Sequence, residues 1–99
     1  MHVVIWEYHV RPAESERFEA LYGAQGEWVA LFRCWPGYRS TELLRGDGDR
    51  YVTIDRWNSQ DEYERFQQQA RADYARLDAL GDALTVDERR IGAFDATAV

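Results

Sequence analysis

Two stretches of the sequence place side chains that could do chemistry at alternate positions, the spacing that brings them to one face of a β-strand. These residues are Ile5, Glu7 and His9 in the first stretch, and Thr53, Asp55 and Trp57 in the second. If both stretches are strands of one sheet, the six side chains can line a single pocket in each subunit. The expected substrate contacts are Ile5, Glu7, Thr53 and Asp55.

Proton transfer is the chemistry that Glu7 and His9 suggest. A neutral imidazole accepts a proton near neutral pH, and a neighbouring carboxylate raises its pKa and orients the ring. Glu7 and Asp55 offer an alternative, because two carboxyl groups in one pocket raise the pKa of one of them. Each carboxylate could instead be paired with an arginine such as Arg39 or Arg56, which would make it structural.

Two aromatic side chains complete the candidate site. Trp57 would stack against a planar ligand, or else fill a dimer interface. Tyr63 would hydrogen-bond a substrate oxygen, or else pack in the helix core with its hydroxyl at the rim. The candidate catalytic residues are therefore Trp57, Tyr63 and His9.

The sequence favours neither a metal nor a cofactor. The single cysteine, Cys34, excludes a Cys-based zinc site. A metal set of Glu7, His9 and Asp55 can be drawn, but it lacks a ligand-spacing motif. The glycines within residues 46–49 belong to a predicted hairpin and not to a phosphate-binding loop. We expect chemistry that uses no bound metal or cofactor.

Composition limits the other functions. The 99 residues are 45% hydrophobic and 14% aromatic, which predicts a single folded domain over residues 1–99. The 12 basic residues, all arginine, face 18 acidic ones, for a net charge of −6. Binding to nucleic acid or to an anionic membrane surface is disfavoured, since both need a basic face. No stretch reaches the ~18 apolar residues of a membrane helix, so we expect a cytoplasmic protein.

Hydrophobic periodicity predicts the elements that would position these side chains. Strands are expected at residues 2–10, 38–45, 50–57 and 84–94, the last with Ile91 and Phe94 as apolar anchors. A helix follows Pro12, is interrupted by two glycines, and is followed by a helical turn at 27–32. A capping box at Ser59 begins an amphipathic helix that extends to about residue 80, where Gly81 stops it.

This order, βαββαβ, implies a ferredoxin-like α+β fold: a four-stranded antiparallel sheet with both helices on one face. The other face is then uncovered. The residues expected on it are Val3, Ile5, Thr53 and Trp57. Such a surface is too apolar to stay in water, so we expect a two-fold homodimer formed through the sheet face, enclosing a barrel-like space.

Three segments carry a resemblance to a known family: VVIWEYHVRP, WVALFRCWPGYRSTELL and YVTIDRWNSQDEYERF. Over residues 2–94 the chain resembles the antibiotic biosynthesis monooxygenase domain family of the dimeric α+β barrel superfamily. The resemblance implies cofactor-free oxidation: an electron-rich phenol or anthrone loses a proton and reacts directly with O₂. It also implies that Trp57 and Tyr63 line the pocket, and an asparagine is usual where this chain has Thr53.

The resemblance leaves three functional hypotheses. The first is a small-molecule pocket that oxidises an aromatic metabolite without a cofactor. The second is a non-catalytic dimeric binding module whose pocket is filled by its own aromatic rings. The third is an isomerase or lyase that uses Glu7 or His9 as a base. Haem bound through an axial histidine, as in related haem-degrading proteins, is disfavoured because the second helix has no histidine and Glu7 stands where those proteins use asparagine.

Overall fold

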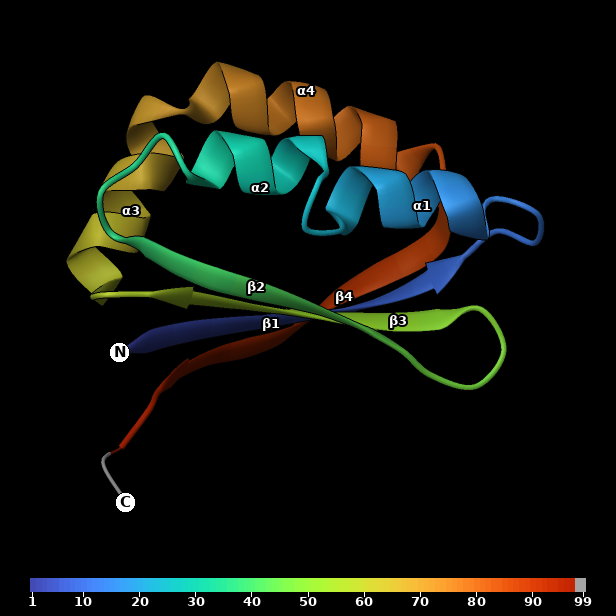
Figure 1. Ribbon diagram of the computed structural model, residues 1–99, viewed down its shortest axis with the longest axis horizontal. Coiled ribbons are helices and arrows are strands. Elements are labelled where there is room, and N and C mark those ends of the chain that lie inside the picture. Colours follow the sequence, from blue (N-terminus) through green and yellow to red (C-terminus); the bar gives the residue numbers. More distant parts are fainter. Residues whose placement is uncertain (98–99) are drawn as a thin grey trace.

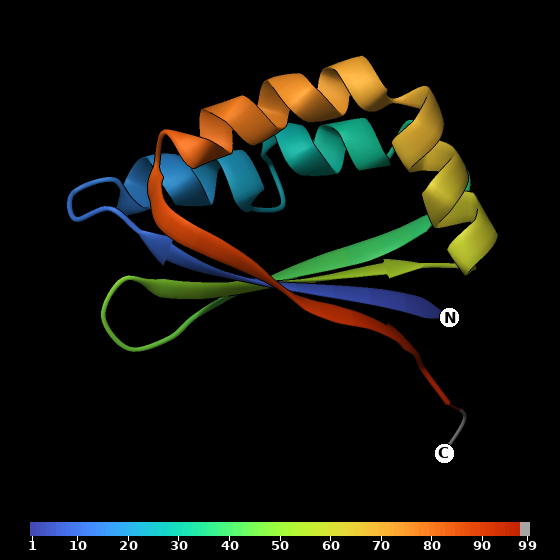
Figure 2. The ribbon, with the colours of Figure 1, turned by 180° about the vertical axis from the view of Figure 1, so that it is seen from behind.

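One antiparallel sheet, covered by helices on a single face, makes up the fold (Figure 1). A computed structural model describes residues 1–97. The elements are β1 (His2–Val10), α1 (Ser15–Tyr22), α2 (Glu27–Phe32), β2 (Tyr38–Arg45), β3 (Arg50–Trp57), α3 (Gln60–Gln69), α4 (Arg71–Asp82) and β4 (Thr85–Asp95). The strand order is β2-β3-β1-β4, so the predicted ferredoxin-like α+β fold is confirmed. Seen from behind, the opposite face of the sheet is free of helices (Figure 2).

The helical segment after β3 differs from its prediction in two ways. Ser59 caps it as expected, because its hydroxyl accepts a hydrogen bond from the Glu62 amide at 3.2 Å. The segment is, however, two helices that meet at the buried Ala70. Gly81 does not stop the second helix but lies within it. A Cβ at Gly81 would lie 2.1 Å from the Tyr22 hydroxyl, so this glycine allows α4 to approach α1 closely.

Strand pairing decides which side chains of β3 face the helices. In β1, Val4 and Tyr8 are buried under the helices, at 1% and 5% exposure. Asp55 lies directly opposite Val4, and Thr53 lies opposite Trp6, which shares the Val4 face. Directly paired residues project to the same face of a sheet. Thr53 and Asp55 therefore lie on the helix-covered face, and the prediction that Thr53 lies on the open face is wrong.

Trp57 is likewise buried on the covered face. Its side chain is fully buried within this one chain, and its ring centroid lies 5.0 Å from that of Phe66 and 5.6 Å from that of Tyr63. The prediction that Trp57 lies on the open face is therefore wrong. Its neighbours are aromatic rings from the helices, which together build most of the core. The large side chains of this core that are almost completely buried include Phe18, Tyr51, Trp57, Phe66 and Leu77.

The open face retains a substantial apolar surface. Val3 and Ile5 lie on it as predicted, since Val3 pairs with Phe94 and Ile5 pairs with Ile54. Phe94 is 50% exposed, so it does not anchor β4 in the core as predicted. Ile91, the other predicted anchor, is 42% exposed beside a β-bulge. No helix in residues 1–97 is both long and apolar enough to cross a membrane.

Candidate active site

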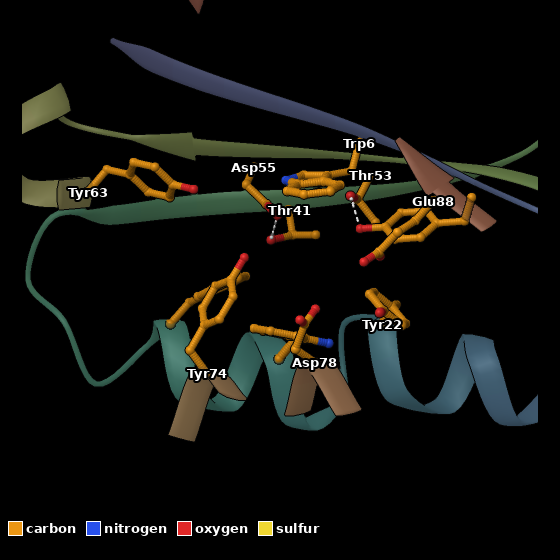
Figure 3. A pocket seen from close by; sticks show the side chains of 12 residues that line it. Trp6, Tyr22, Thr41, Thr53, Asp55, Tyr63, Tyr74, Asp78 and Glu88 are labelled. Atoms are coloured by element: carbon orange, nitrogen blue, oxygen red, sulfur yellow. Dashed lines mark hydrogen bonds between the residues drawn. The ribbon is translucent and has the colours of Figure 1, made fainter. Parts of the chain in front are cut away.

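A pocket opens between the covered face of the sheet and the helices (Figure 3). Its residues are Trp6, Tyr8, Tyr22, Trp28, Phe32, Thr41, Thr53, Asp55, Tyr63, Tyr74, Asp78 and Glu88. Seven of these twelve are aromatic, so the walls are mostly flat rings. The cavity volume is about 40 Å³, and the mouth of the pocket is open to solvent.

Asp55 presents a carboxyl group to this pocket. The Tyr38 hydroxyl donates to Thr41 Oγ1 at 2.8 Å, and the Thr41 hydroxyl donates to Asp55 Oδ1 at 2.7 Å. No arginine or histidine in residues 1–97 forms an ion pair with Asp55, and its second oxygen has no hydrogen bond there. Burial raises the pKa of Asp55 to about 6, and the Thr41 hydrogen bond opposes that shift. Asp55 can therefore accept a proton near neutral pH.

Two tyrosine hydroxyls point toward the space beside Asp55. Figure 3 shows the Tyr63 and Tyr74 side chains, which come from α3 and α4, directed toward Asp55 and Thr41. Burial raises the pKa of both phenols, so they remain protonated hydrogen-bond donors at neutral pH. The Tyr63 hydroxyl also accepts a hydrogen bond from Gln67 Nε2 at 2.9 Å. These groups could hold a ligand oxygen next to the Asp55 carboxylate.

A second acidic group lies elsewhere in the pocket. Glu88 comes from β4, directly opposite Tyr8, and Asp78 comes from α4. With Asp82, they bring carboxylate oxygens within 4.8 Å of one another. Burial, followed by the charges of Asp78 and Asp82, raises the pKa of Glu88 to about 7. Burial also raises the pKa of Asp78.

Thr53 and Tyr8 form a satisfied pair in the pocket wall. The Tyr8 hydroxyl and Thr53 Oγ1 are 3.0 Å apart, and both side chains are buried. Trp57 does not line the pocket, although it packs edge-to-face against Tyr63, which does. His2, the other histidine of the chain, also packs against the Tyr63 ring, with the two ring centroids 5.2 Å apart. Trp57 and His2 therefore contact a residue of the pocket wall without lining the pocket themselves.

The remaining predicted site residues lie on the open face. Glu7 binds Arg50 and Arg89, the latter at 2.9 Å. Hydrogen bonding to Arg50 is the main cause of the lowered pKa of Glu7. The His9 side chain is 61% exposed and lies 3.4 Å from Asp87.

The predicted common pocket is therefore only partly correct. Ile5 pairs with Ile54 and lies on the open face with Glu7 and His9. The prediction that these three share a pocket with Thr53 and Asp55 is wrong, because the register places the two groups on opposite faces of the sheet. For the same reason, Glu7, His9 and Asp55 cannot bind one metal ion.

Several pocket residues were not among the predicted site residues. Trp6 and Tyr8 were recognisable as the inner face of β1, so correct pairing with β3 would have identified them. Thr41, Tyr74 and Glu88 come from three different elements. Nothing in their local sequence distinguishes them from surface polar residues or ordinary core aromatics.

Comparison with known proteins agrees with this architecture. The profile of the antibiotic biosynthesis monooxygenase family matches residues 1–76. A crystal structure of SnoaB, a cofactor-independent oxygenase from Streptomyces nogalater, is 28% identical, with a TM-score of 0.69, and the match covers 99% of this chain and 92% of that one. A SnoaB variant in which one asparagine is replaced is 25% identical, with a TM-score of 0.82 and coverage of 99% and 94%.

More distant structures share the fold. A Pseudomonas aeruginosa protein is 21% identical, with a TM-score of 0.72 and coverage of 98% of this chain and 94% of that one. A search of curated proteins found no significant match. The family match and the likeness to SnoaB support a monooxygenase-like role in binding a small molecule. The predicted resemblance is confirmed, and the chain belongs to the antibiotic biosynthesis monooxygenase family.

Proposed function

We propose that this protein oxidises an electron-rich aromatic compound with O₂, without a bound metal or organic cofactor, in the pocket between sheet and helices. The observation that carries the proposal is the Asp55 carboxyl group, which lies in a pocket lined by aromatic rings and has one free oxygen and no cationic partner among residues 1–97. The likeness to SnoaB, a cofactor-independent oxygenase, supports the same chemistry. Asp55 takes the role of general base that the sequence suggested for His9.

The reaction is balanced by the substrate and O₂ alone. Asp55 removes a proton from the activated CH₂ of an anthrone or from a phenol, leaving an electron-rich anion. The anion donates electrons to O₂, and one oxygen atom forms a bond to the ring carbon. In an anthrone, Asp55 returns its proton to the resulting peroxide, and loss of water, which takes the second hydrogen of the CH₂ carbon, leaves a carbonyl group. One oxygen atom ends in the quinone and the other in water, while the CH₂ carbon supplies all four electrons.

The aromatic walls of the pocket favour a flat ligand. Its cavity volume of about 40 Å³ is smaller than a three-ring compound, so binding requires the lining side chains to move apart and the ligand to extend into the open mouth. Trp6 and Tyr74 offer faces and edges for ring stacking. The Tyr63 ring packs edge-to-face against Trp57, and its hydroxyl would donate a hydrogen bond to the oxyanion that forms.

Oxygen uptake tests the proposal. Purified protein is mixed with dihydroxyanthrone in an oxygen electrode, and the rate of uncatalysed autoxidation is subtracted. Wild-type protein should accelerate uptake, and Asp55→Asn should lower the catalysed rate by about a hundredfold or more. The matched control is Asp87→Asn, because Asp87 is an exposed aspartate of the open face. His9→Ala should also leave the rate unchanged.

Two results would reject this assignment. If wild-type protein does not accelerate uptake for any electron-rich phenol or anthrone, the protein is not a cofactor-independent oxidase of such compounds. If Asp55→Asn retains the wild-type rate, the base is a different group. The tests require that each variant keeps the wild-type circular dichroism spectrum, so that loss of activity is not loss of fold.

A non-catalytic binding module is the second candidate function. The observation in its favour is the small enclosed space, since aromatic side chains of the chain itself already fill much of the region between sheet and helices. Such a module would bind a flat aromatic compound but consume no O₂. An isomerase or lyase with Glu7 or His9 as its base loses its support, because both residues lie on the open face.

We further propose that two copies associate through the open face of the sheet. Leu44 and Phe94 leave large apolar side chains on this face, 47% and 50% exposed, beside the partly exposed Ile5 and Ile54. Contact between two such faces would remove these side chains from water. The pocket is enclosed by elements of one chain, so association is expected to support the sheet rather than to create the pocket.

A further inference from the structure

We infer that the pocket selects an uncharged, hydroxylated aromatic ligand and rejects an otherwise similar ligand that carries a carboxylate. This inference rests on the proposed function for the aromatic nature of the ligand. The preference about charge follows separately, from the polar groups that line the pocket. It narrows the substrate class from aromatic compounds in general to neutral phenols and their esters or alcohols.

Carboxyl groups face the pocket from both sides. Figure 3 shows Asp55 beside Thr41 and, across the pocket, Glu88 and Asp78 with their carboxyl groups directed toward each other. Among the lining residues, which all belong to the described part of the chain, there is no arginine, lysine or histidine. A ligand carboxylate would therefore meet like charge beside Asp55 and beside Glu88 and Asp78, in a site partly shielded from water.

The arginines that could neutralise these acids are engaged elsewhere or lie outside the pocket. Arg50 and Arg89 bind Glu7 on the open face, and Arg56 binds Glu42 at 2.8 Å. Arg90 acts on the Tyr63 phenol, whose pKa burial raises and Arg90 lowers, but it does not line the pocket. Near Tyr63 the positive charge of Arg90 therefore partly offsets the acids, whereas no cationic residue lines the pocket beside Glu88 and Asp78.

The pocket also offers hydrogen-bond donors to a ligand. The Tyr63 and Tyr74 hydroxyls point toward the space beside Asp55, and burial raises the pKa of both phenols, so they stay protonated. The Tyr63 hydroxyl accepts from Gln67 Nε2 at 2.9 Å, which leaves its own proton available to a ligand oxygen. A ligand that places an acceptor beside Asp55 would therefore be favoured.

These requirements together point to a hydroxyl group. A ligand hydroxyl donates to the Asp55 carboxylate and accepts from the Tyr63 or Tyr74 phenol beside it. An ammonium group satisfies the acids but cannot accept a hydrogen bond. A carboxylate can accept but is repelled by the acids. An uncharged phenol or alcohol is the group that meets both conditions.

Binding of three matched dihydroxyanthraquinones tests this inference. They differ in one ring substituent, which is methyl, hydroxymethyl or carboxylate, and all are stable to O₂, so binding is measured without turnover. Quenching of tryptophan fluorescence is followed at about pH 8, where Asp55 and Glu88 are ionised. The carboxylate compound should bind about tenfold more weakly than the methyl compound, and the hydroxymethyl compound at least as tightly.

Variants then link the preference to the pocket. In the double variant Asp78→Asn, Glu88→Gln, the difference between methyl and carboxylate compounds should shrink severalfold. The matched control is Asp73→Asn, an exposed residue in the first turn of α4 that does not line the pocket. It should leave the difference unchanged. Thermal unfolding of each variant verifies that the fold is intact.

The outcomes separate this inference from the proposed oxidation. Equal or tighter binding of the carboxylate compound overturns it, and so does an undiminished difference in the double variant. Failure of all three compounds to bind up to their solubility limits overturns it as well. If the selectivity is observed but no electron-rich phenol or anthrone gives catalysed O₂ uptake, the preference stands and the proposed oxidation is rejected.

Discussion

The two faces of the sheet place the same functional group in opposite electrostatic situations. On the helix-covered face, Asp55 has no cationic partner within the described residues 1–97, and burial raises its pKa to about 6. On the open face, Glu7 is held between Arg50 and Arg89, and hydrogen bonding to Arg50 lowers its pKa. Glu7 stays ionised and paired, so it cannot take up a proton near neutral pH. Asp55 can take up a proton near neutral pH, because burial raises its pKa and no cationic group among residues 1–97 pairs with it.

From this difference we propose separate tasks for the two faces. The covered face combines a carboxyl group of raised pKa with a wall of aromatic rings, which is the combination that a proton-abstracting pocket needs. The open face combines ion pairs with exposed apolar side chains such as Leu44, which is typical of a surface that another protein covers. Chemistry on one face and association on the other can be tested separately.

The largest expected effect compares two phenylalanines on opposite faces. Phe66 is fully buried among aromatic rings of the covered face, whereas Phe94 is 50% exposed on the open face. Phe66→Ala should lower the free energy of unfolding by about 3–5 kcal/mol, because it leaves a cavity in the core. Phe94→Ala should change it by less than about 0.5 kcal/mol in dilute solution. Urea denaturation followed by circular dichroism measures both.

The contrast between Phe66 and Phe94 has a clear failure condition. Similar losses for both variants in dilute protein would show that the open face is covered by the chain itself. If instead the Phe94→Ala loss appears only as protein concentration rises, the open face takes part in association.

Within each strand, alternation was predictable, but the choice of face was not. Residues 50–57 alternate between two sets, and both contain large apolar side chains. Val52 and Ile54 look like the core set, yet Tyr51 and Trp57, with larger rings, occupy the core. The decision rests on the register with β1, which pairs Trp6 with Thr53. That register depends on tertiary packing, and the alternation of residues within one strand does not predict it.

The element order was predictable because local signals mark it. The hairpin at residues 46–49 and the cap at Ser59 were predicted from turn and capping chemistry, and the structure has both. The pairing of Asp78 with Glu88 could not be predicted from the sequence. The two residues lie on α4 and β4 and come together only in the folded chain. The break at Ala70 also lacks a local signal, because alanine favours helix.

The second expected effect concerns association through the open face. Leu44 on β2 and Leu80 on α4 are nearly equally exposed, at 47% and 46%, but on different sides of the molecule. Leu44→Glu should weaken self-association by about a hundredfold or more, because a two-fold interface would bury the new charge twice. Leu80→Glu should leave it unchanged. Sedimentation velocity over a concentration series gives the association constants, and a wild-type chain that remains a monomer throughout would reject association through this face.

The third effect is a gain in stability from removing the proposed base. The pKa of Asp55 is raised from 3.8 to about 6 in the folded chain, so the folded state binds protons more tightly than the unfolded state in that range. The contribution of Asp55 to the free energy of unfolding is therefore greatest below pH 3.8. It falls as the pH rises to about 6. Asp55→Asn should be more stable than wild type above that range, on the order of 1–2 kcal/mol after allowance for pocket water, and not at acidic pH. Thermal unfolding across the range measures it.

This gain would accompany the loss of O₂ uptake expected of the same variant. A residue that costs stability and is retained for chemistry behaves in this way. Thr41→Val is a useful companion, because it removes the hydroxyl that donates to Asp55 at 2.7 Å. It should raise the pKa of Asp55 further and move the pH dependence of stability upward. An Asp55→Asn variant that is less stable than wild type at neutral pH would contradict the unpaired state of this carboxylate.

The smallest expected effect is a loss of stability in Glu7→Gln, on the open face, whereas Asp55→Asn should give a gain. Because the pKa of Glu7 is lowered in the folded chain, its ion pairs stabilise the fold above the ordinary carboxyl range and are lost as pH falls through the folded pKa. Glu7→Gln should therefore be slightly less stable than wild type at neutral pH, with the difference vanishing in acid. High salt should reduce the difference, since exposed pairs are screened. If Glu7→Gln instead stabilised the chain at neutral pH, Glu7 and Asp55 would both lower the free energy of unfolding there. The proposed difference between the two faces would then be rejected.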